Sequence, residues 1–155
     1  AHALPCGIDM ATLSGGDKLE AKLKEIADKL AGAKSVNVGF LEGARYPDGT
    51  PVAAVAFWNE YGTVKAPPRP FFRSAIARHT SEWADTLEGA AKHYDYDAKS
   101  VLSAVGVKIA EDVQQSIVGW TDPRNADSTI AKKGFNKPLI DTGVMQRAVD
   151  FEVKE

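Results

Sequence analysis

The sequence has little cysteine, histidine or methionine: one cysteine, three histidines and two methionines among 155 residues. The single thiol, Cys6, cannot form an internal disulfide, and no second cysteine is present to share a metal ion with it. No run approaches the roughly 18 apolar residues of a membrane span, and the first residues lack the basic start and apolar stretch of a secretion signal. We therefore expect synthesis inside the cell and no membrane contact.

Neither sign of charge dominates, since 19 Lys and Arg accompany 21 Asp and Glu, for a formal net charge of −2. Without bulk positive charge, any contact with nucleic acid has to be local. The 44% of apolar residues and 26% of charged residues are typical of a globular chain of one domain. Glycine and proline without a sustained period predict an arm over residues 1–16, followed by a single α+β domain over residues 17–155.

Apolar residues recur at helical spacing over much of the chain. The strongest pattern covers residues 97–117, where one apolar stripe repeats in steps of three and four. Asp17 and Thr50 are expected to cap helices, because their side chains can accept hydrogen bonds from the free N–H groups of a first turn. The sequence predicts helices over residues 17–31, 51–61, 71–79, 81–94 and 97–117, with a short one that starts at residues 141–143 and ends at residue 147.

A period of two indicates strands over residues 35–41 and 148–153. Two strands are marginal alone, so we expect them to pair and to pack on a helix layer. The predicted fold class is α+β, with a small antiparallel sheet packed against several helices. Residues 119–138, rich in Asp, Asn, Gly and Lys, are expected to form a long loop, and such loops often serve function or assembly.

The residues that most often carry enzyme chemistry are scattered. His2, His79 and His93 form no metal-ligand motif, and we interpret His79 and His93 as structural or surface residues. Cys6 has no neighbouring base that would activate it. The sequence therefore predicts no enzyme, with no catalytic residue, cofactor or bound metal.

Two weaker enzymatic hypotheses concern phosphate binding and paired carboxylates. The glycines that follow the first predicted strand lack the Lys and Ser or Thr of a phosphate-binding P-loop. Glu42, Asp48 and Glu60 could meet as a carboxylate pair, although carboxylates in loops are usually solvated. Neither pattern favours catalysis.

Local basic groups lie beside aromatic residues in two segments. Guanidinium and ammonium groups next to rings suit a protein partner or single-stranded nucleic acid. Burial in the core is the favoured alternative for at least one of Phe71 and Phe72. The candidates for partner contact are Arg69, Phe71, Phe72, Arg73, Lys132, Lys133, Phe135 and Lys137.

Three sequence blocks, in this order, carry a resemblance to a known family. They are residues 58–62 (WNEYG), residues 67–73 (PPRPFFR), and residues 128–134 (STIAKKG) leading into residues 138–145 (PLIDTGVM). Over residues 36–153 the chain resembles the tail-completion and neck proteins of long-tailed bacteriophages. This group is related to the lambda-type minor tail completion protein and includes virion morphogenesis and tail-component proteins.

The resemblance implies a structural virion protein that completes the head-proximal tail end or the head–tail joint, without catalysis. The implied partners are other phage neck and tail proteins and further copies of the chain in a homo-oligomeric ring, with a hexamer as one option. Assembly would take place in the host bacterial cytoplasm, and DNA contact in the channel is allowed but not required. The resemblance also implies that Arg69 binds a carboxylate or carbonyl near Glu60, and that Asp141 or Thr142 caps a short helix.

Other roles fit the same residues. A tail terminator or a head–tail adaptor ring protein is the first alternative, and a nucleic-acid-binding module, identified by salt-dependent DNA binding, is the second. The expected contact elements are the arm over residues 1–16 and the loop over residues 119–137. In a further hypothesis, Lys132, Lys133 and Lys137 face the exiting DNA or an acidic partner ring.

Overall fold

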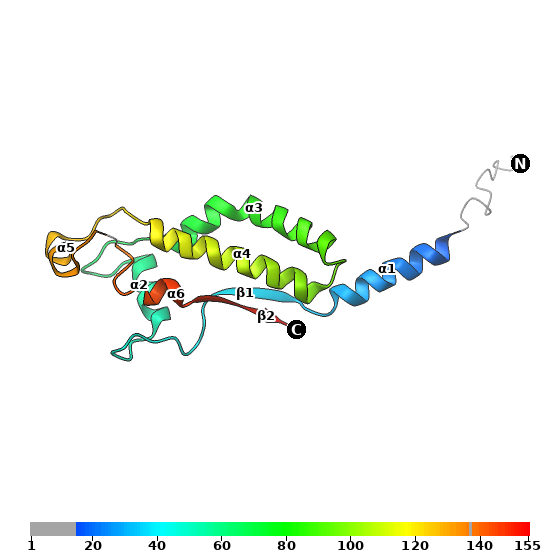
Figure 1. Ribbon diagram of the computed structural model, residues 1–155, viewed down its shortest axis with the longest axis horizontal. Coiled ribbons are helices and arrows are strands. Elements are labelled where there is room, and N and C mark those ends of the chain that lie inside the picture. Colours follow the sequence, from blue (N-terminus) through cyan, green and yellow to red (C-terminus); the bar gives the residue numbers. More distant parts are fainter. Residues whose placement is uncertain (1–14, 137) are drawn as a thin grey trace, which may run out of the picture.

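The computed structural model describes residues 15–136 and 138–155. Within these residues, one small antiparallel sheet of two strands packs against helices, so the predicted α+β class is confirmed (Figure 1). In chain order the elements are α1 (Gly16–Leu30), β1 (Ser35–Phe40), α2 (Val52–Tyr61), α3 (Phe71–His93), α4 (Ala98–Gly119), α5 (Asp127–Lys133), α6 (Val144–Arg147) and β2 (Val149–Lys154).

Helix α4 lies between the sheet and α3, so that the central part of the fold has three layers (Figure 1). The strands pair in a register that runs from Ser35 opposite Lys154 to Phe40 opposite Val149. The sheet comes very close to α4 at Gly106, where a Cβ would lie 2.6 Å from Cδ2 of Phe151. Only a glycine allows this approach without movement of the sheet.

The apolar core lies where α2, the start of α3, the end of α4 and α6 meet. Its largest fully buried side chains are Phe71, Ile117, Val52 and Val113. The apolar stripe predicted for residues 97–117 points into this core and toward the sheet, with Val105, Val113 and Ile117 buried. Burial of these side chains is the main source of stability for the fold.

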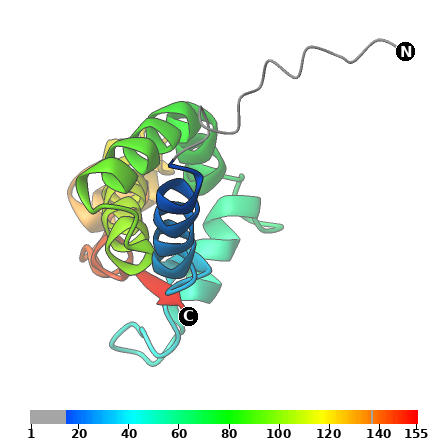
Figure 2. The same ribbon diagram turned by 90° about the vertical axis from the view of Figure 1, so that its right-hand side faces the viewer.

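Helix α1 extends away from the rest of the protein, and it has no buried residue (Figures 1 and 2). The predicted arm over residues 1–16 lies almost wholly outside the described residues, and Gly16 is already part of α1. Among the residues that the structure describes, no helix has both the length and the apolar character that crossing a membrane requires.

Two predicted boundaries were wrong. The helices predicted over residues 71–79 and 81–94 form one continuous helix, α3, because no proline or glycine lies beside Thr80, whose hydroxyl donates a hydrogen bond to the Ile76 carbonyl within the helix. The expected long loop over residues 119–138 contains α5, which ends at the left-handed Gly134 (φ 83°). A helix of seven residues is too short to show a clear apolar period.

The predicted side-chain caps were also wrong. Helix α1 begins one residue earlier than expected, so Asp17 lies in its first turn and Gly15 is the N-cap. Pro51 precedes α2, and the Thr50 N–H instead donates to Oδ1 of Asp48, 2.9 Å away, within the preceding turn.

The cap that the resemblance implied for the short helix is absent. The N-cap of α6 is Gly143, whose φ of 76° is left-handed, and no side chain bonds to the first turn. Asp141 and Thr142 lie before this glycine and are exposed. The glycine itself sets the direction in which the chain enters α6, so no side-chain cap forms.

Candidate functional site

The corner between α2 and α3 is built around Glu60, a buried carboxylate with 6% of its surface exposed. Its Oε2 accepts a hydrogen bond from the Phe72 N–H at 2.9 Å, and its Oε1 accepts one from the Arg73 N–H at 3.1 Å. These donors are free N–H groups of the first turn of α3, where a negative charge is favourable. Glu60 thus caps α3 from the end of α2.

The proline-rich segment between α2 and α3 is held at both of its ends. Gly62, with φ 79°, ends α2, and a Cβ there would lie 2.8 Å from the backbone nitrogen of Pro68. The Arg69 N–H donates to the Asn59 carbonyl at 2.6 Å, and Nε of Arg69 donates to the Pro123 carbonyl at 3.2 Å. The corner is therefore rigid and tied to the segment that follows α4.

The resemblance implied that Arg69 binds a carboxylate or carbonyl near Glu60. Its backbone N–H does donate to the carbonyl of the adjacent Asn59, whereas its side chain donates to the Pro123 carbonyl. Glu60 instead pairs with Arg73, four residues later, whose Nε lies 2.8 Å from Oε1. Burial lowers the pKa of the Arg69 guanidinium. The four-residue shift reflects the start of α3, which brings Arg73 back over the end of α2.

An aromatic patch, formed by Phe57, Tyr61 and Arg73, is exposed on this corner. The rings of Phe57 and Tyr61 are 4.8 Å apart between centroids, and the Arg73 guanidinium carbon lies 4.8 Å from the Tyr61 centroid. Phe57 and Tyr61 are 60% and 56% exposed, which is unusual for large rings. Exposed aromatic residues beside arginine are common at protein interfaces.

The structure divides the other candidate contact residues. Phe71 is buried in the core with 1% exposed, so it does not form part of a surface, whereas Phe72 is partly buried beside it. This agrees with the expected burial of at least one of the two. Lys132 and Phe135 are exposed, and Lys137 lies outside the described residues.

Lys133 lies beside an aromatic ring of its own segment, and the charge of Arg69 acts on it. Its Nζ lies 5.2 Å from the centroid of the Phe135 ring. Burial lowers the pKa of the Lys133 ammonium, the charge of Asp141 raises it, and the positive charge of Arg69 lowers it. Arg69 and Lys133 therefore lie close enough for their charges to interact.

A depression of about 590 Å³ lies on the surface beside Lys133. It is lined by α2, by Lys133 and by the chain that leads into α6. Trp58, which is 49% exposed, forms part of its wall. Residues from the first and third blocks of the resemblance therefore line the same depression. The second block is bonded to the first, because Arg69 binds the Asn59 carbonyl and Arg73 binds Glu60.

The segment that follows α4 holds two buried donors without acceptors. Among the described residues, the buried side-chain atoms without a hydrogen-bond partner are Nε1 of Trp120 and Nδ2 of Asn125. Buried polar groups are almost always paired, because an unpaired donor costs about 1–3 kcal/mol. Both atoms lie in the stretch that was expected to contact partners.

Helix α1 carries a second exposed apolar surface. Leu19, Leu23 and Leu30 are 61%, 57% and 47% exposed, and with Ile26 they form a leucine stripe along one face. An ion pair of 2.5 Å from Lys29 to Asp95 links the end of α1 to the turn after α3. A helix of about 15 residues is marginal in water without packing, so packing of the leucine stripe against a neighbour would stabilise α1.

Comparisons with protein-family models, with curated proteins and with solved structures gave no match for this chain.

Proposed function

We propose that the chain is a structural subunit of the virion of a long-tailed phage, assembled in the host bacterial cytoplasm. It completes the head-proximal end of the tail or the head–tail joint by binding other neck and tail proteins and further copies of itself. The observation that carries the proposal is that all three blocks of the family resemblance gather at one corner of the fold. Blocks far apart in the sequence thus act as one structural unit.

The two exposed apolar surfaces support assembly as the mode of action. The aromatic patch lies at the end of the molecule that holds α2, and the leucine stripe of α1 lies toward the opposite end (Figure 1). Small monomeric proteins rarely expose such surfaces unless a partner covers them. Different surfaces at two ends allow a head-to-tail contact, which closes into a ring when the rotation between copies is suitable.

The test uses the phage that encodes the chain and the purified protein in parallel. Leu19→Gln with Leu23→Gln should abolish joined, infectious particles while the purified variant keeps its circular dichroism spectrum. Ala21→Gln with Lys24→Gln, which alters the other faces of α1, is the matched control and should assemble normally. Normal joining by a phage that lacks the whole chain would refute the proposal.

A tail terminator or head–tail adaptor role differs only in the position of the ring. Cross-linking in purified particles distinguishes these roles, because the chain would contact either the tail tube or the head-side connector. A hexamer is one ring that native mass spectrometry of assembled material would detect.

Lys133 lies beside the Phe135 ring and its charge interacts with that of Arg69, which favours nucleic-acid binding as a second candidate. Single-stranded DNA would contact the ring and the charges together. Fluorescence anisotropy at low and high salt tests this role: affinity that falls steeply with salt, and that Lys132→Glu with Lys133→Glu removes, would favour it. Under the structural proposal, the purified chain needs no such binding.

A further inference from the structure

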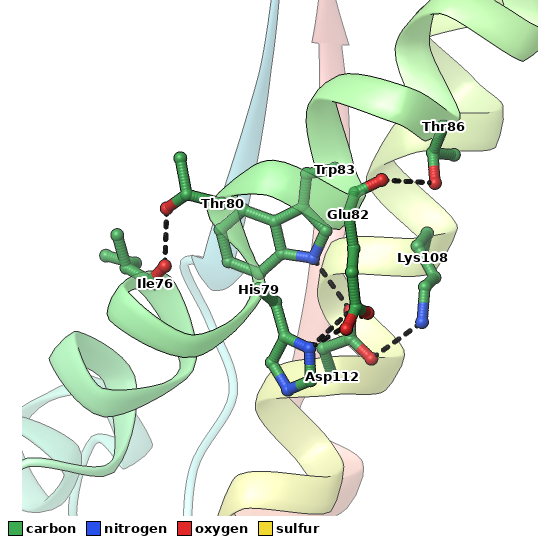
Figure 3. A network of polar contacts seen from close by, with 8 residues as sticks. All are labelled: Ile76, His79, Thr80, Glu82, Trp83, Thr86, Lys108 and Asp112. Atoms are coloured by element: carbon green, nitrogen blue, oxygen red, sulfur yellow. Dashed lines mark hydrogen bonds and ion pairs between the residues drawn. The ribbon is translucent and has the colours of Figure 1, made fainter.

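Helices α3 and α4 face each other through a polar cluster that the assembly role does not use (Figure 3). His79 and Glu82 come from α3, and Asp112 comes from α4. One potential ligand atom from each of these three residues lies within 4.8 Å of the other two. Nδ1 of His79 is 3.1 Å from Oε2 of Glu82 and 4.0 Å from Oδ2 of Asp112.

The position of each group follows from the helices. His79 and Glu82 are three residues apart on α3, so their side chains lie on one face. Asp112 is buried, with 7% of its surface exposed, at the point where α4 faces α3. Glu82 is more than half exposed, which leaves the cluster open to solvent.

Two donors hold the Asp112 carboxylate in place. Nε1 of Trp83 donates to Oδ2 at 2.7 Å, and Nζ of Lys108 donates to Oδ1 at 2.9 Å (Figure 3). Burial raises the pKa of Asp112, but these hydrogen bonds and the charge of Lys108 outweigh burial and lower it, so the group stays ionised. Oδ2 has a second lone pair besides the one that accepts from Trp83. Carboxylates oriented by such outer donors are common as metal ligands.

We propose that His79, Glu82 and Asp112 form a binding site for a divalent cation of the zinc class that links α3 to α4. An imidazole nitrogen with two carboxylate oxygens suits Zn²⁺ or Co²⁺, whereas Ca²⁺ and Mg²⁺ prefer oxygen ligands alone. Ligand atoms around a tetrahedral zinc ion lie roughly 3.4 Å apart, given bonds of about 2.1 Å. The observed separations need only small rotations of the half-buried His79 and the exposed Glu82.

The charges around the three ligands also favour the binding of a cation. Two carboxylates and one ammonium surround the site, so a divalent cation would meet a net negative environment while Lys108 remains on the far oxygen of Asp112. Three protein ligands leave one tetrahedral position for water. The cation would stabilise the folded chain in proportion to its concentration, because the unfolded chain does not hold these ligands together.

The test is calorimetric titration of the full chain with zinc chloride and with cobalt chloride, in a His2→Gln, Cys6→Ser background that removes two other potential zinc ligands. We expect one ion per chain, a visible absorption band typical of bound Co²⁺, and a higher thermal midpoint with zinc. His79→Gln and Glu82→Gln, at accessible positions that the fold tolerates, should each weaken binding by about tenfold or more.

The matched controls lie on the same helix. His93→Gln and Glu88→Gln change an exposed histidine and an exposed glutamate outside the cluster, and should leave the affinity unchanged. The proposal is overturned if zinc does not saturate the chain up to millimolar concentration. It is equally overturned if the control variants weaken binding as much as His79→Gln and Glu82→Gln do.

Discussion

The Arg73 side chain binds Glu60 through two hydrogen bonds, in addition to the bond from the Arg73 backbone N–H. Nε of Arg73 donates to Oε1 of Glu60 at 2.8 Å, and Nη2 donates to the Glu60 backbone carbonyl at 3.0 Å. The same carboxylate caps the first turn of α3, so one buried side chain sets the angle between α2 and α3. The aromatic patch depends on this angle, because Arg73 also covers Tyr61.

We predict that Glu60→Ala lowers the free energy of unfolding by about 2–4 kcal/mol, since it leaves two helix N–H groups and Nε of Arg73 without their acceptor. Arg73→Ala should cost only about 1 kcal/mol, because the Arg73 side chain is 54% exposed and both N–H caps remain. Urea unfolding followed by circular dichroism measures both values. Equal losses in the two variants would contradict the capping role of Glu60.

Two helical glycines should respond to alanine in opposite directions. A Cβ at Gly106 would lie 2.6 Å from the Phe151 ring and 2.9 Å from Cγ2 of Val36, so Gly106→Ala should lower the free energy of unfolding by about 1–3 kcal/mol. Gly89, inside α3, has open space around it. Gly89→Ala should therefore raise the free energy of unfolding by about 0.5–1 kcal/mol through helix propensity. Thermal unfolding of the two variants side by side checks the difference in sign.

The elements with long, regular patterns could be predicted from the sequence. The stripe in α4 and the alternation in β1 and β2 arise from burial against one neighbour, and burial dictates periodicity. The predicted break between two helices near Thr80 was wrong, because it was based on local polarity rather than on burial. The polar residues there mark a solvent-facing turn of a continuous helix, and a local change in polarity does not end a helix without a breaker.

The candidate sites depend on contacts between distant residues, which periodicity does not encode. Glu60 caps a helix whose first residue is eleven positions later, and no pattern in the sequence indicated Arg73 as its ion-pair partner. Asp112 meets His79 only because α3 and α4 pack against each other. The spacing of three residues between His79 and Glu82 can be seen in the sequence, but the approach of Asp112 to both cannot.

We predict that Trp83→Phe destabilises the protein by about 1–2 kcal/mol near neutral pH, because the indole donates to a buried carboxylate. Despite the opposing effect of burial, this bond helps to keep the pKa of Asp112 below its usual value in the folded chain. The stabilisation is therefore complete above the unfolded pKa of about 3.9 and is lost as the pH falls through the lower folded value. Unfolding measured from neutral to acidic pH should show the difference from the wild-type protein shrinking.

Trp120→Phe is the matched control for that pH series. The Trp120 Nε1 is buried and has no hydrogen-bond partner in the described part of the chain, so its removal breaks no bond to a carboxylate there. The difference between Trp120→Phe and the wild-type protein should stay constant over the same pH range. If Trp83→Phe shows an equally constant difference, the bond to Asp112 does not contribute to the acid sensitivity.

Hydrogen exchange should separate α1 from the rest of the fold. Because α1 has no buried residue and is tied to the rest by an exposed ion pair, its amides should exchange rapidly in the purified monomer, while those of α4 stay protected. In assembled particles the leucine stripe is covered under the proposed function, and the amides of α1 should then exchange at least about tenfold more slowly. Mass spectrometry of peptides from residues 16–30 and 98–119 provides the comparison. Strong protection of α1 in the monomer would mean that this helix is stable alone and does not need a neighbour.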